Sequence, residues 1–194
     1  MGSEMCIRDS DVSVAIQGVG HVGLNLCRLL HEAGAKLTVA DVNRHNLQLA
    51  RDELPVTEVA PNALLFSKVD VLAPCALGNI LTAQTIPNIQ AKIVAGAANN
   101  QLATEQDGAR LADRDILYAP DYVINAGGII NVEHEYFGNS SDDLVMAEVS
   151  EIPKRLRIIF GEAKDSGEAT NLIADRMARR IVAAGVEQQA VEGQ

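Results

Sequence analysis

The stretch from Val12 to Asp41, VSVAIQGVGHVGLNLCRLLHEAGAKLTVAD, constrains the fold of this chain more than any other. In its first part Val12, Val14 and Ile16 alternate with smaller or polar residues, a pattern that predicts a strand beside a core. A G-x-G-x-x-G pattern follows where this strand must turn into a helix, and 37–40 form a second predicted strand. Strand, glycine-rich turn, helix and strand in this order predict a βαβ unit with parallel strands.

Each glycine of the turn has a predicted physical role. Gly18 permits the tight turn, Gly20 lets backbone N–H groups approach a pyrophosphate, and Gly23 lets the helix pack closely on the strand. The N-terminus of the following helix favours negative charge. Asp41 ends the second strand, inside the window of roughly 20 residues in which an acid binds the adenosine ribose. The stretch therefore predicts a dinucleotide-binding site; the alternative is a turn of the same shape without a ligand.

The helix of this unit carries one apolar face, and Gly34 is expected as its C-cap. Beyond it, the pattern predicts helices at 43–51 and 61–66 and strands at 56–59, 69–73, 92–95 and 116–118. Apolar strands that alternate with helical connections are typical of a doubly wound, mostly parallel α/β sheet of the Rossmann type, with helices on both faces. Two helices near 152–163 and 172–182 form a predicted helical C-terminal tail.

The predicted domain organisation has three parts. The first ten residues, MGSEMCIRDS, show no strand or helix pattern and are similar to a cloning remnant followed by translated adapter sequence, so 1–10 are interpreted as a non-native or disordered leader. Residues 11–140 are interpreted as the Rossmann domain, and 141–194 as C-terminal helices that complete it. On this interpretation the native sequence was cut just before Asp11.

Composition excludes several classes of partner. A net charge of -10 and a pI of about 4.8 argue against binding to nucleic acid or to an anionic membrane. The longest uncharged run, 71–91, is interrupted by prolines and amides and does not predict a membrane span. The cysteines Cys6, Cys27 and Cys75 form no even disulfide framework, which favours reduced thiols in the cytoplasm.

Two sets of residues could suggest a metal site or a nucleophile, and we interpret both without such chemistry. Glu133, His134 and Glu135 point to different sides of a helix, so we interpret them as a solvated face and expect no metal site. Cys75 has no histidine and acid placed to activate it, so we interpret it as a small residue of a cleft wall rather than a nucleophile.

Three loops follow the ends of predicted strands, at 74–78, 96–100 and 120–128. In open α/β sheets the ligand lies outside the carboxyl ends of the strands, so these loops are the candidate cofactor wall. Asn99 and Asn125 offer amides that can donate and accept hydrogen bonds, which suits a nicotinamide carboxamide or a substrate carboxylate. Helix capping or turn filling explains each single asparagine equally well.

The loops also carry a resemblance to a known family. The segments GVGHVGLNLCRLLHEAGAKLTVADVN, APCALG, AGAANNQL and YAPDYVINAGGIINV strongly resemble the NAD-binding domain of the Glu/Leu/Phe/Val amino-acid dehydrogenases, and within that family the leucine dehydrogenases. The resemblance extends from Asp11 to the C-terminal helix. It implies oxidative deamination, in which an L-amino acid, NAD and water give a 2-oxo acid, ammonia and NADH.

The resemblance also implies roles for residues of this chain. Ile129 and Val132 match positions of a side-chain pocket for branched aliphatic substrates. Asp41 and Val42 would contact the adenosine ribose, Cys75 and Ala76 would line the cofactor cleft, and Asn99 and Asn125 would approach the nicotinamide. The remaining cofactor contacts would come from the glycine-rich turn, namely Gly18, Val19, Gly20, His21, Val22, Gly23 and Leu24.

The family's catalytic residues have no match in this sequence. The resembling enzymes carry their catalytic lysines and aspartate in an N-terminal domain, and we expect that domain to be absent here. We therefore assign no catalytic residue and expect a fragment that binds NAD without turnover. The complete enzyme would take a small L-amino acid and form a homo-oligomer. The alternative function is a stand-alone NAD-sensing regulatory module, which the glycine-rich turn fits equally well but the other loops do not.

Overall fold

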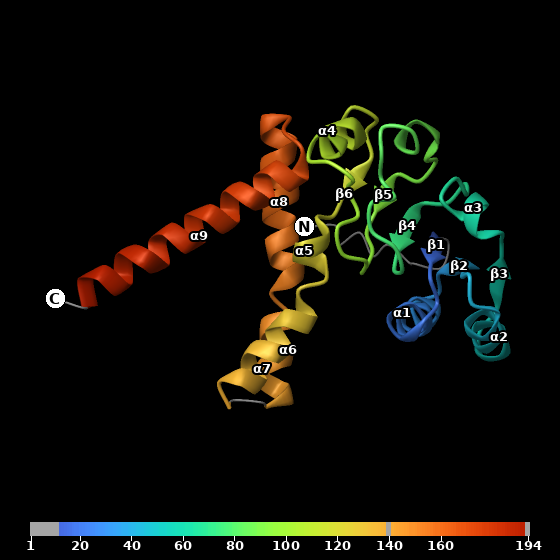
Figure 1. Cartoon of the computed structure of the whole chain (residues 1–194), viewed down its shortest axis with the longest axis horizontal. Helices are drawn as coiled ribbons and strands as arrows, with labels where there is room; N and C mark the ends of the chain where they lie inside the picture. Colours follow the sequence, from blue (N-terminus) through green and yellow to red (C-terminus); the bar gives the residue numbers. More distant parts are fainter. Residues whose placement is uncertain (1–11, 139–140, 193–194) are drawn as a thin grey trace, which may run out of the picture.

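The computed structural model describes residues 12–138 and 141–192 (Figure 1). The leader predicted at 1–10 lies outside the described residues. Within the described part of the chain, no helix is long and apolar enough to cross a membrane.

The central element is a six-stranded sheet in which every neighbouring pair of strands is parallel, in the order β3-β2-β1-β4-β5-β6. This order is that of a doubly wound Rossmann sheet, which confirms the predicted fold class. The strands are β1 (Ser13–Gln17), β2 (Lys36–Ala40), β3 (Val56–Glu58), β4 (Val71–Pro74), β5 (Ile93–Val94) and β6 (Leu117–Tyr118).

Most strand boundaries differ from the predicted ones by one or two residues, and the differences at Pro74 and Gly34 have a clear local cause. Pro74 was expected after the fourth strand, but it is the last residue of β4, opposite Gln17. Its carbonyl still accepts a hydrogen bond from the N–H of Ala98, so the proline ends the strand without leaving its acceptor unpaired. The predicted C-cap Gly34 lies one residue later than the cap itself, Ala33, and it adopts the left-handed conformation with φ +90°.

Helices cover both faces of the sheet, with α1 and α2 on one side and α3 and α4 on the other (Figure 1). Asn43 caps α2 as predicted, because its side chain accepts the N–H of His45. The helices that follow β6 form the C-terminal part. The α-helices are α1 (His21–Glu32), α2 (Arg44–Glu53), α3 (Pro61–Leu64), α4 (Gln106–Ala112), α5 (Asp121–Ile124), α6 (Gly127–Tyr136), α7 (Asp142–Val149), α8 (Ile152–Ser166) and α9 (Thr170–Glu192), and η2 (Ile86–Asn88) is a 3₁₀ turn.

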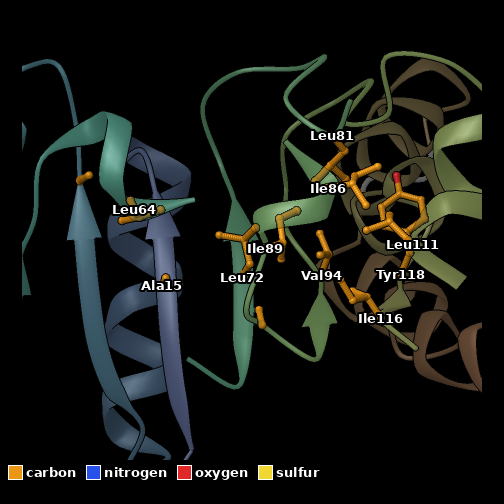
Figure 2. Packing of buried hydrophobic residues seen from close by; sticks show 12 residues of the cluster. Ala15, Leu64, Leu72, Leu81, Ile86, Ile89, Val94, Leu111, Ile116 and Tyr118 are labelled. Atoms are coloured by element: carbon orange, nitrogen blue, oxygen red, sulfur yellow. The ribbon is translucent and has the colours of Figure 1, made fainter. Parts of the chain in front are cut away.

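The core has two main layers because successive side chains of a strand point to opposite faces. In β1, Val14 and Ile16 belong to the layer that contains Leu24 of α1 and Leu47 of α2. Ala15 belongs to the other layer, which Figure 2 shows. The other members of this layer that Figure 2 labels are Leu64, Leu72, Leu81, Ile86, Ile89, Val94, Leu111, Ile116 and Tyr118.

The last helix is packed only over its first part. Ile173 and Ala174 are buried against Ile159 of α8, whereas Ile181 and Val182 are 63% and 66% exposed. Figure 1 shows the far part of α9 extending away from the rest of the molecule. The apolar face at 172–182 is therefore buried only over its first part.

We expect hydrogen exchange to be faster in the second half of α9 than in the central strands. Segments with few buried contacts open at lower free energy than core strands. The amides of 176–184 should therefore exchange well before those of β1 and β2, as measured by mass spectrometry of peptides. Equal protection in the two regions would contradict this prediction.

Candidate cofactor site

The candidate site lies where the chain order of the strands reverses. β1 has β2 on one side and β4 on the other, so the chain winds outward from β1 in both directions, the arrangement in which open α/β sheets bind ligands in a crevice at the carboxyl ends of the strands. The turn at Gly18 follows β1, and Cys75 and Ala76 follow β4. The structure thus places the glycine-rich turn and the loop at 74–78 together.

The three glycines meet three different environments. Gly18 has φ +88°, and a Cβ there would lie 2.5 Å from the Cβ of Ala76. A Cβ on Gly23 would lie 1.9 Å from the carbonyl oxygen of Gly18, so only glycine allows α1 this close to the strand end. At Gly20 the nearest heavy atom would be 3.9 Å away, on Asn46. The first and third glycines therefore serve packing, whereas the second faces space that a ligand can enter.

The helix that follows the turn can receive an anion. No side chain caps α1 at Gly20, so the N–H groups of its first turn remain open to a ligand. Val19 and Leu24 are buried, so only their backbone atoms could contact a cofactor. His21 and Val22 are exposed beside the turn.

Asp41 is joined directly to the glycine-rich turn. One carboxylate oxygen accepts the N–H of Val19 at 2.9 Å and the side-chain amide of Asn46 at 3.2 Å. The other oxygen accepts the N–H of Asn43 at 2.7 Å. Burial opposes ionisation of Asp41, but the hydrogen bonds from Asn43 and Val19 outweigh it and hold the pKa of the carboxyl below its usual value.

A cleft of about 830 Å³ lies beside Asp41 at the carboxyl ends of β2 and β3. Val42 lines it and is 86% exposed. Two arginines also line it, and Arg51 is paired with Glu58 at 2.8 Å. The space has room for an adenosine, with a carboxylate on one side and an apolar side chain on another.

The second part of the site is a pair of asparagines at the ends of β5 and β6. The Nδ2 of Asn125 donates to the Oδ1 of Asn99 at 2.5 Å and to the carbonyl of Ala97 at 3.3 Å. Because a carbonyl can only accept, the contact with Ala97 fixes which end of the Asn125 amide is nitrogen. The pair therefore has the Oδ1 of Asn125 as an acceptor and the Nδ2 of Asn99 as a donor, the two functions that a primary carboxamide complements.

Both asparagines line a cleft of about 670 Å³. Ile129 of α6 also lines it, and Val132 lies one helical turn further on; they are 66% and 54% exposed. Cys75 is half-buried, and burial raises the pKa of its thiol, which opposes the thiolate form that a nucleophile needs.

Several residues of this cleft were not singled out by the sequence. They are polar groups from the N-cap of α4, from α5 and from α9, namely Glu105, Asp121, Tyr122, Asn171 and Asp175. The hydroxyl of Tyr122 donates to Asp175 at 2.7 Å and to the carbonyl of Asn171 at 3.1 Å, which joins α5 to α9. Asp121 and Tyr122 fall within the loop that was predicted as cofactor wall, but no local pattern separates them from their neighbours.

The segment Glu133–Glu135 is solvated only in part. His134 has a side chain that is 14% exposed and contacts Glu148 of α7 at 3.1 Å. The interpretation as a solvated face is therefore wrong for His134, because α7 folds back over α6. Among the described residues, no group of three or more His, Cys, Asp or Glu side chains could hold a metal ion.

Comparison with known proteins identifies the family. The model of the Glutamate/Leucine/Phenylalanine/Valine dehydrogenase family matches residues 39–184. This chain belongs to that family. Leucine dehydrogenase of Geobacillus stearothermophilus is 45% identical over 169 residues, which are 87% of this chain and 46% of the relative. L-tryptophan dehydrogenase of Nostoc punctiforme is 47% identical over 168 residues, 86% of this chain and 47% of the relative.

Solved structures agree with this membership. The crystal structure of L-tryptophan dehydrogenase from Nostoc punctiforme has a TM-score of 0.88 and 44% identity, over 93% of this chain and 54% of that one. Glutamate dehydrogenase from Peptoniphilus asaccharolyticus shares the fold, with a TM-score of 0.69 at 21% identity. The chain spans about half the length of the curated relatives it matches. The predicted resemblance to the dehydrogenase family is confirmed.

Proposed function

We propose that this chain is the NAD-binding part of an NAD-dependent L-amino-acid dehydrogenase. The full reaction is the oxidative deamination of a leucine-like, branched-chain amino acid to the 2-oxo acid, with release of ammonia and NADH. The observation that carries the proposal is the glycine-rich turn, whose second glycine faces open space while Asp41 is hydrogen-bonded to the turn itself. Family membership supports it, because a Rossmann dehydrogenase uses a nicotinamide cofactor.

The cofactor would lie across the crevice with its two halves in different clefts. The pyrophosphate would lie on the first turn of α1, which includes His21, Val22 and Gly23. The adenosine would occupy the cleft at Asp41 and Val42. The nicotinamide would pass Cys75 and Ala76 and reach the asparagine pair. When bound, NAD supplies the hydride acceptor, and the chain orients the ring through Asn99 and Asn125.

The substrate side chain would lie against α6. Ile129 is branched, apolar and exposed in the cleft that holds the asparagine pair, and Val132, also branched and exposed, lies one helical turn further along α6. An apolar surface of this kind favours leucine, valine or isoleucine over a charged amino acid. Relatives of nearly equal identity are named for leucine and for tryptophan, so the proposed preference rests on these two side chains.

The remaining proposals concern the whole protein. We propose that the complete enzyme is a cytoplasmic homo-oligomer whose catalytic lysines and aspartate lie outside this chain, in the part of the relatives that it does not span. Cys27 and Cys75 are free thiols, which fits a reducing compartment. The alternative of a stand-alone NAD-sensing module is favoured by no observation here, since the matched relatives are dehydrogenases.

We expect the chain to bind NAD more tightly than NADP. Asp41 would accept a ribose hydroxyl beside the glycine-rich turn to which it is hydrogen-bonded, and its charge would repel a 2′-phosphate. Arg44 lines the same cleft and offsets part of this repulsion. Titration calorimetry should give a lower Kd for NAD by about tenfold or more, a difference of ~1.4 kcal/mol.

Asp41→Ser should narrow that difference, and Asp52→Ser on the exposed face of α2 is the matched control. Asp52 contacts Gln48 and lies outside the cleft residues, so its loss should leave both affinities unchanged. Equal or tighter binding of NADP by the unaltered chain would refute the NAD preference. Absence of binding by either cofactor would refute the proposed function.

A further inference from the structure

The loop that carries Asn99 is held from several sides. Asn100, the next residue, has a positive φ of 53°, a conformation that costs energy in residues other than glycine. Its carbonyl accepts the N–H of Asn79 at 2.6 Å, and a Cβ on Gly78 would lie 2.6 Å from the carbonyl of Asn99. The side chain of Gln101 is fully buried and donates to the carbonyls of Gly96 and Ala98.

The remaining support comes from a buried carboxylate. Asp121 is 7% exposed, and one of its oxygens accepts the N–H of Asn100 at 2.6 Å. Its other oxygen accepts the hydroxyl of Tyr118 at 2.7 Å. Asp121 is also the first residue of α5, and its carbonyl accepts the N–H of Asn125. Asp121 therefore contacts the backbone of Asn125 and of Asn100, the residue next to Asn99.

We propose that Asp121 is the positioning residue that holds the asparagine pair in the arrangement that recognises the nicotinamide carboxamide. The inference rests on the proposed NAD-binding function and adds a residue to it. Asp121 would act through the backbone and not on the carboxamide, because both of its carboxylate oxygens already accept hydrogen bonds, from Asn100 and Tyr118. It fixes the left-handed backbone of Asn100, and so the direction of the Asn99 side chain, through a charge-assisted hydrogen bond across 21 positions of sequence.

The test compares NAD with ADP-ribose, which has the same adenosine and pyrophosphate but no nicotinamide. Titration calorimetry on the whole chain should show that Asp121→Ala weakens NAD binding about tenfold, the effect of losing one charged hydrogen bond. ADP-ribose binding should stay within about twofold of the unaltered chain, because its contacts lie at the glycine-rich turn and Asp41. A merely structural role of Asp121 would affect the two ligands equally.

Asp107→Ala is the matched control. Asp107 is 2% exposed and accepts two hydrogen bonds from Thr104, but it lies on α4 and does not line the cleft. Asp121→Asn keeps an acceptor for the N–H of Asn100, so it should bind NAD only about threefold more weakly than the unaltered chain, since a neutral acceptor forms a weaker hydrogen bond. This smaller loss of NAD affinity remains measurable if Asp121→Ala does not fold.

Four results would overturn the inference. They are equal losses for NAD and ADP-ribose in Asp121→Ala, no loss for either, an NAD-selective loss in Asp107→Ala, and equal affinities of the unaltered chain for the two ligands. In the last case NAD is still bound, so the proposed function stands while the role of Asp121 fails. An unaltered chain that binds neither ligand would instead refute the proposed function, and the inference with it.

Discussion

The purified chain should form no detectable NADH from NAD and L-leucine. Hydride transfer requires the α-carbon of the substrate to be fixed against the nicotinamide, and deamination requires a base. The cleft that holds the asparagine pair is lined by amides, carboxylates, a tyrosine and apolar groups, and no lysine or histidine is among its described residues. Loss of a positioned base typically costs about 10²–10⁴-fold. Loss of positioning costs more, since effective molarities reach roughly 10⁵–10⁸ M.

The assay follows absorbance at 340 nm at alkaline pH, with leucine dehydrogenase of Geobacillus stearothermophilus as the positive control. Turnover by this chain that disappears in Gly20→Ala would contradict the account, because it would place the base and the substrate clamp within the chain. Addition of the other half of a related dehydrogenase as a separate polypeptide is the complementary experiment, and recovery of activity would support the proposed division of roles.

Replacement by alanine should affect stability strongly at Gly23 and very little at Gly20. In Gly23→Ala the new Cβ would lie 1.9 Å from the carbonyl oxygen of Gly18, a backbone atom that cannot move without breaking the turn. We expect a loss of at least ~3 kcal/mol in the free energy of unfolding, at the upper end of overpacking effects. In Gly20→Ala the Cβ has no neighbour nearer than 3.9 Å, so stability should change by less than ~0.5 kcal/mol.

Gly20→Ala should nevertheless lose NAD affinity, by about tenfold to 100-fold, because the methyl group occupies the space through which the pyrophosphate approaches backbone N–H groups. Thermal unfolding and calorimetry together separate the two effects. Gly161→Ala, on α8, is the control. A Cβ there meets nothing within 4 Å, so this variant should be more stable than the unaltered chain by roughly 0.5–1 kcal/mol and should bind NAD with unchanged affinity. A stable Gly23→Ala with normal NAD affinity would contradict the packing role of that glycine.

The local parts of the fold could be predicted because local rules determine them. The strand, turn, helix and strand from Val12 to Asp41 are specified by apolar periodicity and glycine spacing, and the cap at Asn43 by a single side chain. Hydrogen bonds between distant residues were not predictable in this way. Asp121 and Asn100 are 21 positions apart, and Tyr122 and Asp175 are 53 apart.

The contacts that the sequence does not predict have a related cause. His134 is partly covered by α7, and no pattern within its own helix indicates that contact. The second half of α9 has apolar residues at helical spacing, but spacing does not show whether another element lies opposite them. In both cases the deciding information is which elements meet in space, and periodicity along one element does not contain it.

The most direct test of the central claim is an amide NMR titration of the isotope-labelled chain with NAD. We expect the largest shifts on the backbone amides of 18–24, on the residues around Asp41, and on the side-chain amides of Asn99 and Asn125, with small shifts over 141–166. Shifts that are absent from the glycine-rich turn, or that are largest outside the crevice between β1 and β4, would contradict it.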